Sequence, residues 1–319
     1  MDIQEYMPAP EVIAGIRNDM GKYEGERIAA QRAVRWRVPV FLGVFLAIVF
    51  GIALLFNGLA DPFEQWFSAP HVILYVIAFI AAFFIYARAM KPATDLQESF
   101  RGRVLPMVFA FVKDPQYRKS VTPDSFPRMP PETVGSFNRQ SFDDVISGTY
   151  EDFPFELYET HLEQKVGKSS TTMFDGVIVA FEKLQPFPGV LVAARKTGKV
   201  VGFFRGLFGT ELEEVQSGVA FLDETYEFRT DNVEAARPLV TGKLAQALTW
   251  LQEAWPEGQA RVALKGNDGF LLLPQAKDFF ELPSISVSLD YKIHIEPMVA
   301  DMAALLATAA LLRKAGARD

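Results

Sequence analysis

The 319-residue sequence contains no cysteine and only three histidines. The absence of cysteine excludes disulfides, iron–sulfur clusters, thiolate zinc sites and thiol catalysis. The histidines, His71, His161 and His294, form no pair at helical spacing, and no HExxH segment occurs. His161 and Glu163 would share one face of a strand, where a solvated surface explains them better than a metal. We therefore expect no metal site and no cofactor.

The sequence has no excess of positive charge, because 39 acidic residues outnumber 32 lysines and arginines and give a formal net charge of −7 at pH 7. Nucleic-acid binding requires a basic face that neutralises phosphates, so we expect no nucleic-acid partner. The stretch from Glu211 to Glu234 is strongly acidic. It offers a surface for a basic protein partner, or it serves only solubility.

The sequence lacks the usual catalytic motifs. Gly167-Lys168-Ser169 resembles the end of a phosphate-binding loop, but Leu162 occupies the position of the required first glycine. A polar hairpin turn is the better interpretation. No GxSxG elbow is present. Asp143 and Asp144 are adjacent, so on a strand they would point to opposite faces, which favours solvated carboxylates. We expect no catalytic residues.

Two long apolar segments are the most informative feature that is present. Val38–Ala60 contains no charged side chain, and Val72–Ala87 is shorter but equally apolar. About 20 apolar residues cross a hydrocarbon core of about 30 Å, so residues 38–90 are predicted to form a transmembrane helical hairpin in the lipid bilayer. Arginine and lysine lie outside both ends of the hairpin. Because such residues favour the cytoplasmic side, we expect both termini there and the first span to be an uncleaved anchor.

Small residues recur along the first span, with Gly43, Ala47 and Gly51 at four-residue spacing. Small residues at this spacing allow transmembrane helices to approach closely. The pattern predicts helix packing, either within the hairpin or between subunits. The sequence leaves both alternatives open.

The remaining sequence predicts an α+β protein with four parts. Residues 1–37 suit a cytosolic amphipathic helix, and 91–131 suit a juxtamembrane helix followed by a proline-rich linker. Residues 132–319 should form a cytosolic domain with a mainly antiparallel sheet and packed helices. Within it, hairpins are predicted over 190–204 and 261–273, each turning at a polar glycine-containing segment.

Asp231–Glu253 has helical periodicity, with Asp231 as the predicted N-cap and Glu234 completing a capping box. Arg237 follows Glu234 by three residues. An arginine near a helix start is unfavourable to the helix dipole unless it is paired. Arg237 is therefore predicted to form a structural ion pair with Glu234 or with an acidic strand residue; less simply, Glu234 and Arg237 form an interaction site.

Several segments together resemble a known family. They are Asp143, Asp144 and Gly148, the stretch PFELYETHLE around Glu159, FFRGLF at 203–208, and the segment 222–248, with Asn232–Arg237 and Leu239 as its most specific part. This order is similar to a bacterial family of two-span membrane proteins catalogued as domain of unknown function 3137. The chain departs from the family pattern at Gly242.

The resemblance covers about residues 32–282 and implies architecture rather than activity. It implies a multi-pass protein of the bacterial inner membrane, and a gene context similar to that of LemA-type membrane proteins makes such a protein one expected partner. Our leading hypothesis is a membrane-anchored, non-enzymatic scaffold or adaptor whose cytosolic domain binds a protein partner or self-associates. The alternative is a membrane-anchored enzyme or small-ligand sensor.

Overall fold

A computed structural model describes residues 7–57, 66–196, 212–255, 260–275, 279–280, 283 and 286–316, apart from the side chains of 97–101, 103–104 and 107. The chain divides into two compact units. Residues 17–104 and 282–291 form the first, called here the hairpin unit. Residues 1–16, 105–281 and 292–319 form the second, the sheet unit. The architecture is α+β, as predicted.

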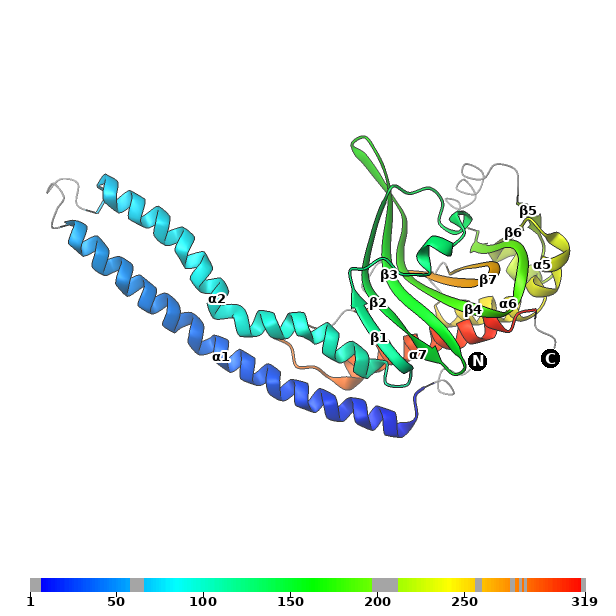
Figure 1. The fold of residues 1–319 in the computed structure, drawn as a ribbon, viewed down its shortest axis with the longest axis horizontal. Coiled ribbons are helices and arrows are strands. Elements are labelled where there is room, and N and C mark those ends of the chain that lie inside the picture. Colours follow the sequence, from blue (N-terminus) through cyan, green and yellow to red (C-terminus); the bar gives the residue numbers. More distant parts are fainter. Residues whose placement is uncertain are drawn as a thin grey trace. The chain divides into compact units, whose positions relative to one another are not determined.

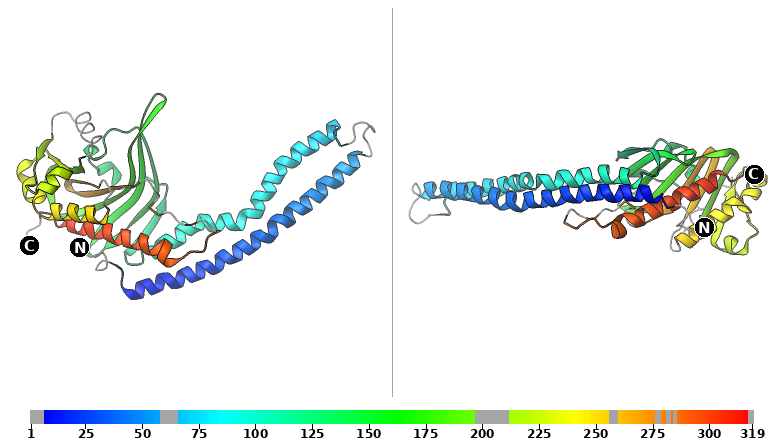
Figure 2. Two further views of the ribbon diagram at one scale, coloured as in Figure 1. Left: turned by 180° about the vertical axis from the view of Figure 1, so that it is seen from behind. Right: turned by 90° about the horizontal axis from the view of Figure 1, so that it is seen from below.

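The hairpin unit is built from α1 (Pro10–Asn57) and α2 (Ala69–Val108), which run side by side (Figures 1 and 2). Each helix has a row of buried or half-buried positions at alternating spacings of three and four residues. In α1 this row includes Tyr23, Val34, Val38, Phe45, Val49 and Ala53, and in α2 it includes His71, Leu74, Ala78, Ile85, Ala89 and Leu96. Such spacing places one apolar seam along each helix.

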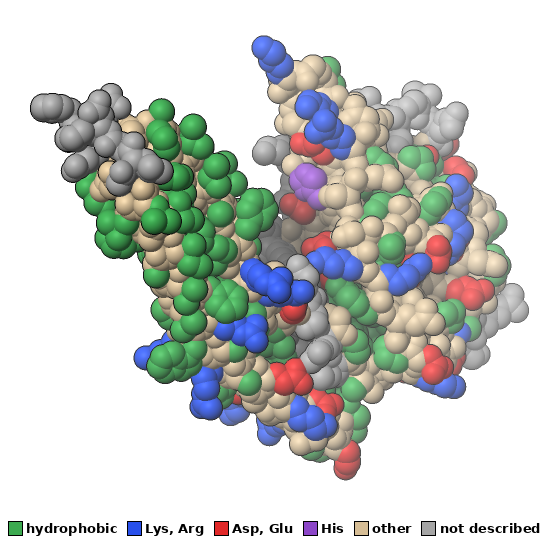
Figure 3. Space-filling model, turned by 60° about the vertical axis from the view of Figure 1, so that its left-hand side comes forward, with side chains coloured by type: hydrophobic (Ala, Val, Ile, Leu, Met, Phe, Trp, Pro, Cys, Tyr) green, Lys and Arg blue, Asp and Glu red, His purple; other side chains and the backbone are tan. Residues whose placement is uncertain are grey.

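The exposed surface of the two predicted spans is apolar. α1 and the Ala69–Leu96 part of α2 are long and apolar enough to cross a membrane, and only 6% of the most apolar window of each is buried within the structure. Figure 3 shows hydrophobic side chains, in green, gathered on one part of the hairpin, with charged side chains, in blue and red, on the rest of the face in view. A surface of this kind suits a lipid environment, because apolar side chains gain nothing from contact with water.

Both helices continue beyond the apolar segments without interruption. α1 begins at Pro10, so the predicted amphipathic helix and the first span are one helix. α2 likewise runs through Lys91 and Pro92, so the second span and the predicted juxtamembrane helix are also one helix.

The described residues of the sheet unit form seven strands: β1 (Lys113–Lys119), β2 (Arg139–Tyr150), β3 (Phe153–Val166), β4 (Ser169–Arg195), β5 (Glu213–Val215), β6 (Tyr226–Thr230) and β7 (Arg261–Pro274). Their order is β1-β2-β3-β4-β6-β5, with β7 on the other edge of β4. Every strand pair is antiparallel. This confirms the predicted antiparallel sheet.

The predicted hairpin over 261–273 is wrong, because this segment is the single strand β7. It pairs with β4 from Gly176↔Pro274 to Ala194↔Arg261. The register shifts fall opposite Gly266–Gly269, where β4 carries extra residues between Glu182 and Val190. The glycines of β7 therefore mark a place where its pairing with β4 is irregular, and the extra residues lie in β4. The predicted turn at 196–199 of the other hairpin lies largely outside the described residues.

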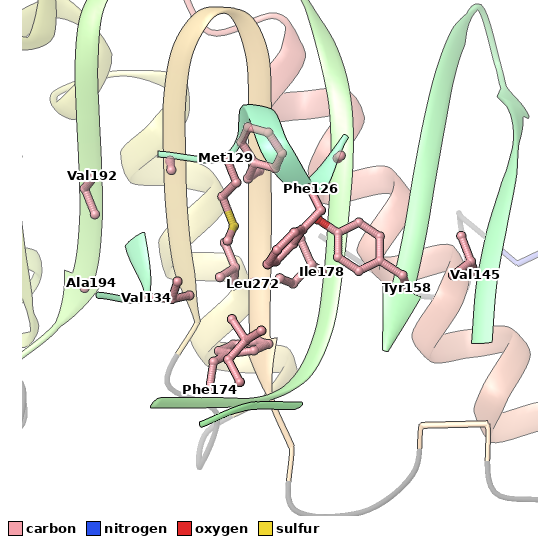
Figure 4. Packing of buried hydrophobic residues seen from close by; sticks show 14 residues of the cluster. Phe126, Met129, Val134, Val145, Tyr158, Phe174, Ile178, Val192, Ala194 and Leu272 are labelled. Carbon is pink, nitrogen blue, oxygen red and sulfur yellow. The ribbon is translucent and has the colours of Figure 1, made fainter. Parts of the chain in front are cut away.

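The segment expected to be a proline-rich linker belongs to the sheet unit. Residues 113–119 form β1, and two short 3-10 helices follow, η2 (Phe126–Arg128) and η3 (Pro131–Thr133). Phe126, Met129 and Val134 pack on one face of the sheet with residues of β2, β3, β4 and β7 (Figure 4). Apolar side chains inside this proline-rich stretch thus form part of the core.

Helices cover the rest of the sheet unit: α4 (Ala220–Thr225), α5 (Val233–Val240), α6 (Lys243–Ala254), the π-helical turn η4 (Tyr291–Ile295) and α7 (Glu296–Arg313). α7 contacts β4, β7 and α6. η4 and α7 together are apolar enough to span a membrane, but 72% of the most apolar window is buried within the structure. α7 is therefore a core helix.

Candidate functional site

The start of α5 places the two residues that the sequence analysis singled out. The N-cap is Asn232, whose side chain accepts a hydrogen bond from Ala235 N at 3.1 Å, so the prediction of Asp231 as the cap is wrong. Asp231 instead accepts from Val190 N at 2.7 Å, where β4 resumes its pairing. The capping box with Glu234 is consequently absent.

α5 and α6 are separate helices rather than the single predicted helix. α5 ends at Thr241 and Gly242, and a Cβ on Gly242 would lie 2.9 Å from the carbonyl oxygen of Pro238. This crowding requires glycine at the break. The chain then begins α6 at Lys243 in a new direction.

Glu234 and Arg237 are both exposed, and the structure contains no hydrogen bond or ion pair between these two described side chains. The predicted ion pair is therefore not formed. Arg237 instead lines a hollow of about 520 Å³ whose opposite wall is the segment 214–218, and Val233, Pro238 and Thr241 lie beside it. The interaction-site alternative for Arg237 stays a prediction.

A second hollow of about 480 Å³ adjoins the first and shares Thr241 with it. Its apolar lining residues are Val219, Leu222, Ala245, Trp250 and Leu311, and Gln246 and Glu253 are among its polar ones. The two hollows are called here the α5–α6 groove. Figure 1 shows that β5, α5 and α6 gather at one end of the sheet unit.

The wall opposite Arg237 is held by Asp223 of α4. Its carboxylate accepts hydrogen bonds from Ser217 N at 2.7 Å, Ser217 Oγ at 2.8 Å and Gly218 N at 3.0 Å. Gly218 has a φ of +72°, which glycine adopts readily. The groove therefore has one wall of helix and one wall of hydrogen-bonded loop.

Three carboxylates come together elsewhere in the sheet unit. The oxygens of Asp143, Asp144 and Glu159 lie within 4.8 Å of one another, and Asp144 and Glu159 are buried. Tyr117 donates a 2.5 Å hydrogen bond to Asp144, and the amides of Phe279 and Phe280 donate to Glu159. Oxygen ligands of this kind suit a hard divalent cation.

The expectation that Asp143 and Asp144 are solvated loop residues on opposite faces is wrong. The register of β2 and β3 shifts between Phe142 and Val145, so the pair lies in a β-bulge. A bulge breaks the alternation of side chains and can direct neighbours to one side. Sequence periodicity alone could not show this.

A polar cleft of about 490 Å³ lies at one end of the sheet face. The buried Glu156 carboxylate in it accepts from Ser125 Oγ at 2.6 Å, Arg118 Nη2 at 2.7 Å and Ser125 N at 2.8 Å. Across the cleft, Arg128 pairs with Asp268 at 3.1 Å. These polar groups converge on one open space.

The lysine-containing turn and two of the histidines considered from the sequence have local structural contacts. Val166 pairs with Ser169, which confirms that Gly167 and Lys168 form a hairpin turn. His161 Nδ1 lies 3.4 Å from Asp175, across the strand pair. His71 is fully buried at the closed end of the helical hairpin, where its ring bonds to Ser68 Oγ at 2.7 Å and to Ala53 O at 3.0 Å.

Two ionisable groups with shifted pKa values, the half-buried Asp301 and the buried Lys183, were not found by sequence reasoning. Burial raises the pKa of Asp301 in α7 to about 6, and burial lowers the pKa of Lys183 in β4 to about 8. Asp301 is the one carboxyl of α7 beyond its first turn, and its position beside the apolar run 302–312 was a usable signal. Lys183 gave none, since it sits among polar neighbours in the sequence.

Gly43, Ala47 and Gly51 are all exposed on α1. A Cβ on Gly43 or Gly51 would meet nothing within 4 Å. The seam positions Phe45, Val49 and Ala53 lie two residues away from them, which is about 200° around a helix. The small residues therefore face away from α2.

No protein-family model and no curated protein matches the chain, so the resemblance to domain of unknown function 3137 stays a prediction. Among solved structures, the chain is similar to the mycobacterial trehalose monomycolate transport factor A, TtfA, at 12% identity and a TM-score of 0.32. The match covers 61% of this chain and 88% of that chain. A likeness at this level carries no information about the function of this chain.

Proposed function

We propose that the protein is a non-enzymatic adaptor of the bacterial inner membrane, with both termini in the cytoplasm and the sheet unit binding a protein partner there. The observation that carries the proposal is the α5–α6 groove, where Arg237 is exposed on a wall beside an apolar hollow. Apolar hollows with a few polar groups are typical binding sites. The exposed hairpin supplies the anchor.

The proposed topology follows from charge. Arg35 and Arg37 precede the first span, and Arg88 and Lys91 follow the second. Lysine and arginine near span ends favour the cytoplasmic side, so the loop between α1 and α2 would face the periplasm. Cysteines placed at Ala14 and at Gly58 should differ in labelling by a membrane-impermeant maleimide, with only the latter labelled in intact cells.

Self-association is part of the same proposal. Gly43, Ala47 and Gly51 form an exposed stripe on the side of α1 opposite the hairpin seam. Small residues at four-residue spacing permit close helix contact in a bilayer. A second copy would pack there, while the sheet unit stays available for another protein. A LemA-type membrane protein is one partner that the family resemblance implies.

Chemical cross-linking in intact membranes, followed by purification of the full chain and mass spectrometry, tests the adaptor function. We expect a second protein to be recovered reproducibly and to be linked to lysines of the sheet unit. Recovery of only the chain itself under several cross-linker lengths would contradict the proposal. A variant lacking the stripe, Gly43→Ile with Gly51→Ile, should still capture the partner.

A small-ligand sensor is the second candidate function, and the polar cleft around Glu156 favours it. Arg118, Arg128 and Asp268 converge there on a space of about 490 Å³, which is large enough for a small metabolite. Thermal-shift screening of the full chain with polar metabolites tests this candidate. A hit that is lost in Asp268→Ala but kept in Lys168→Gln would support the sensor.

A further inference from the structure

We infer that the α5–α6 groove binds a basic, apolar peptide segment of the partner that places one carboxylate against Arg237. The inference rests on the proposed adaptor function and names the site and the class of segment. It combines three observations. The exposed side chain of Arg237 makes no hydrogen bond or ion pair with the described residues, an apolar hollow adjoins it, and exposed carboxylates, called here the acidic rim, lie around both.

Arg237 is the basic group that lines the hollow beside the segment 214–218. Its side chain is exposed and takes part in no hydrogen bond or ion pair with the described residues. A guanidinium presents donors in a planar fork that fits a carboxylate in two parallel hydrogen bonds. A carboxylate on the incoming segment is therefore the natural partner for it.

The adjoining hollow takes an apolar side chain. Val219, Leu222, Trp250 and Leu311 line it, and Val219 is 43% exposed. Phe221, next to this wall in α4, is 48% exposed. Covering such side chains removes apolar surface from water, which favours binding. The two hollows share Thr241, so one short segment can reach both.

The rim limits how acidic the segment can be. Glu214 lines the first hollow and Glu253 the second, and Glu213 and Glu224 are exposed nearby in the chain. Lys196 lies 3.9 Å from Glu214, and Arg229 stands opposite Glu214 in the β5–β6 pair, so Glu214 is partly balanced while Glu253, Glu213 and Glu224 have no basic group paired with them among the described residues. Several carboxylates on the segment would meet like charge, whereas lysine or arginine would be attracted. A basic segment with a single carboxylate fits this distribution.

Fluorescence anisotropy with the full chain in detergent tests the inference. The probe is a pool of labelled, amidated decapeptides of Lys, Leu and Ser in random order with one Glu. In a second pool Gln replaces the Glu, and in a third Glu replaces every Lys. A fourth pool, with Gln and a free C-terminus, distinguishes a chain end from a side chain as the source of the carboxylate.

We expect the one-Glu pool to bind about tenfold more tightly than the Gln pool, because the bound segment would shield Arg237 from water and let it form a bidentate, charge-assisted pair, which is stronger than an exposed ion pair. Arg237→Gln should lower the affinity for the one-Glu pool to that for the Gln pool and leave the Gln pool unchanged. Lys168→Gln, an exposed change in the β3–β4 turn, is the matched control and should alter neither. Gln246→Trp, which fills the apolar hollow, should weaken all pools.

An effect of Arg237→Gln that is equal for both pools, or tightest binding by the all-acidic pool, would overturn the inference. So would concentration-dependent self-association that Arg237→Gln abolishes, because the occupant would then be a second copy. If cross-linking still captures the partner with Arg237→Gln, the adaptor function stands and only the groove assignment fails. Hydrogen exchange of α5 and α6 verifies that each variant is folded.

Discussion

The Glu24 carboxylate in α1 accepts a hydrogen bond from the Ser288 hydroxyl at 3.0 Å, although 264 positions separate the two residues in the chain. The same carboxylate accepts from Leu289 N at 3.4 Å and from Arg27 at 2.6 and 2.7 Å. Arg17 lies 4.5 Å from the ring centre of Tyr291 in the same segment. These contacts fix the segment 286–291 to the helical hairpin.

Glu24→Ala should release this segment and lower stability by about 2 kcal/mol, because the buried Arg27 loses its carboxylate partner. Hydrogen exchange of 286–291 and the unfolding temperature in detergent measure the effect. The matched control is Asp19→Ala, which removes the exposed ion pair with Lys22 and should cost less than about 0.5 kcal/mol. Equal effects of the two changes would show that the contact with Ser288 is not stabilising.

The Glu24 contact also predicts acid sensitivity. The hydrogen bond from Arg27 holds the pKa of the Glu24 carboxyl below its usual 4.5. The unfolded chain then binds a proton more readily than the folded chain, so this contribution is present above about pH 4.5 and is lost as pH falls through the folded pKa. Exchange of 286–291 should rise below pH 4.5 in the native chain, and Glu24→Ala should show no such step.

Asp301 should give the opposite pH dependence. Burial raises the pKa of its carboxyl to about 6, so the folded chain holds the proton more tightly than the unfolded chain does. Stability from this group falls as pH rises from about 4 to about 6. Asp301→Asn should therefore stabilise the protein at pH 7 by about 1–2 kcal/mol and have little effect at pH 4. Glu182→Gln, an exposed change, is the control, and a gain that does not depend on pH would contradict the assignment.

Lys183 is expected to reduce stability at neutral pH. Its side chain is 6% exposed, and burial lowers the pKa of its amine to about 8. Between about pH 8 and 10.5 the unfolded chain binds more protons, so native stability rises with pH across that window. Lys183→Met should raise stability by about 1–3 kcal/mol below pH 8, and the gain should disappear toward pH 10.5. Thermal unfolding at pH 7 and pH 10 measures it.

Patterns that depend on neighbouring residues in the chain were predictable, and those that depend on distant partners were not. The uncharged segment from Val38 and the strand-rich composition predicted the hairpin and the antiparallel sheet. Asp231 and Asn232 are both good helix caps, and only the approach of Val190 N decides between them. The glycines of β7 suggested a turn within that segment. The irregularity is instead in the pairing with β4, which carries the extra residues, and the sequence of β7 alone cannot show it.

The same distinction holds for the candidate site. Arg237 could be singled out because an arginine near a helix start calls for a partner. The groove could not be predicted, because its other wall comes from 214–218 and its shape from the hydrogen bonds of Asp223. The carboxylate cluster depends on a bulge at Asp143 and Asp144 that no local pattern indicates.

The stripe on α1 gives a final prediction, which concerns assembly. Gly43 and Gly51 are exposed on the side opposite the hairpin seam, and a Cβ at either position meets nothing within the chain. Gly43→Ile with Gly51→Ile should leave the hairpin intact, because no neighbour in the structure has to move. The same change should prevent close contact between copies, since packing of this kind requires small residues. Energy transfer between labelled copies in vesicles measures the association constant, which should fall by at least about tenfold, or about 1.4 kcal/mol.

Ala87→Ile, an exposed small-to-large change on α2, is the control and should leave association unchanged. A loss of association in both variants would place the contact elsewhere on the hairpin.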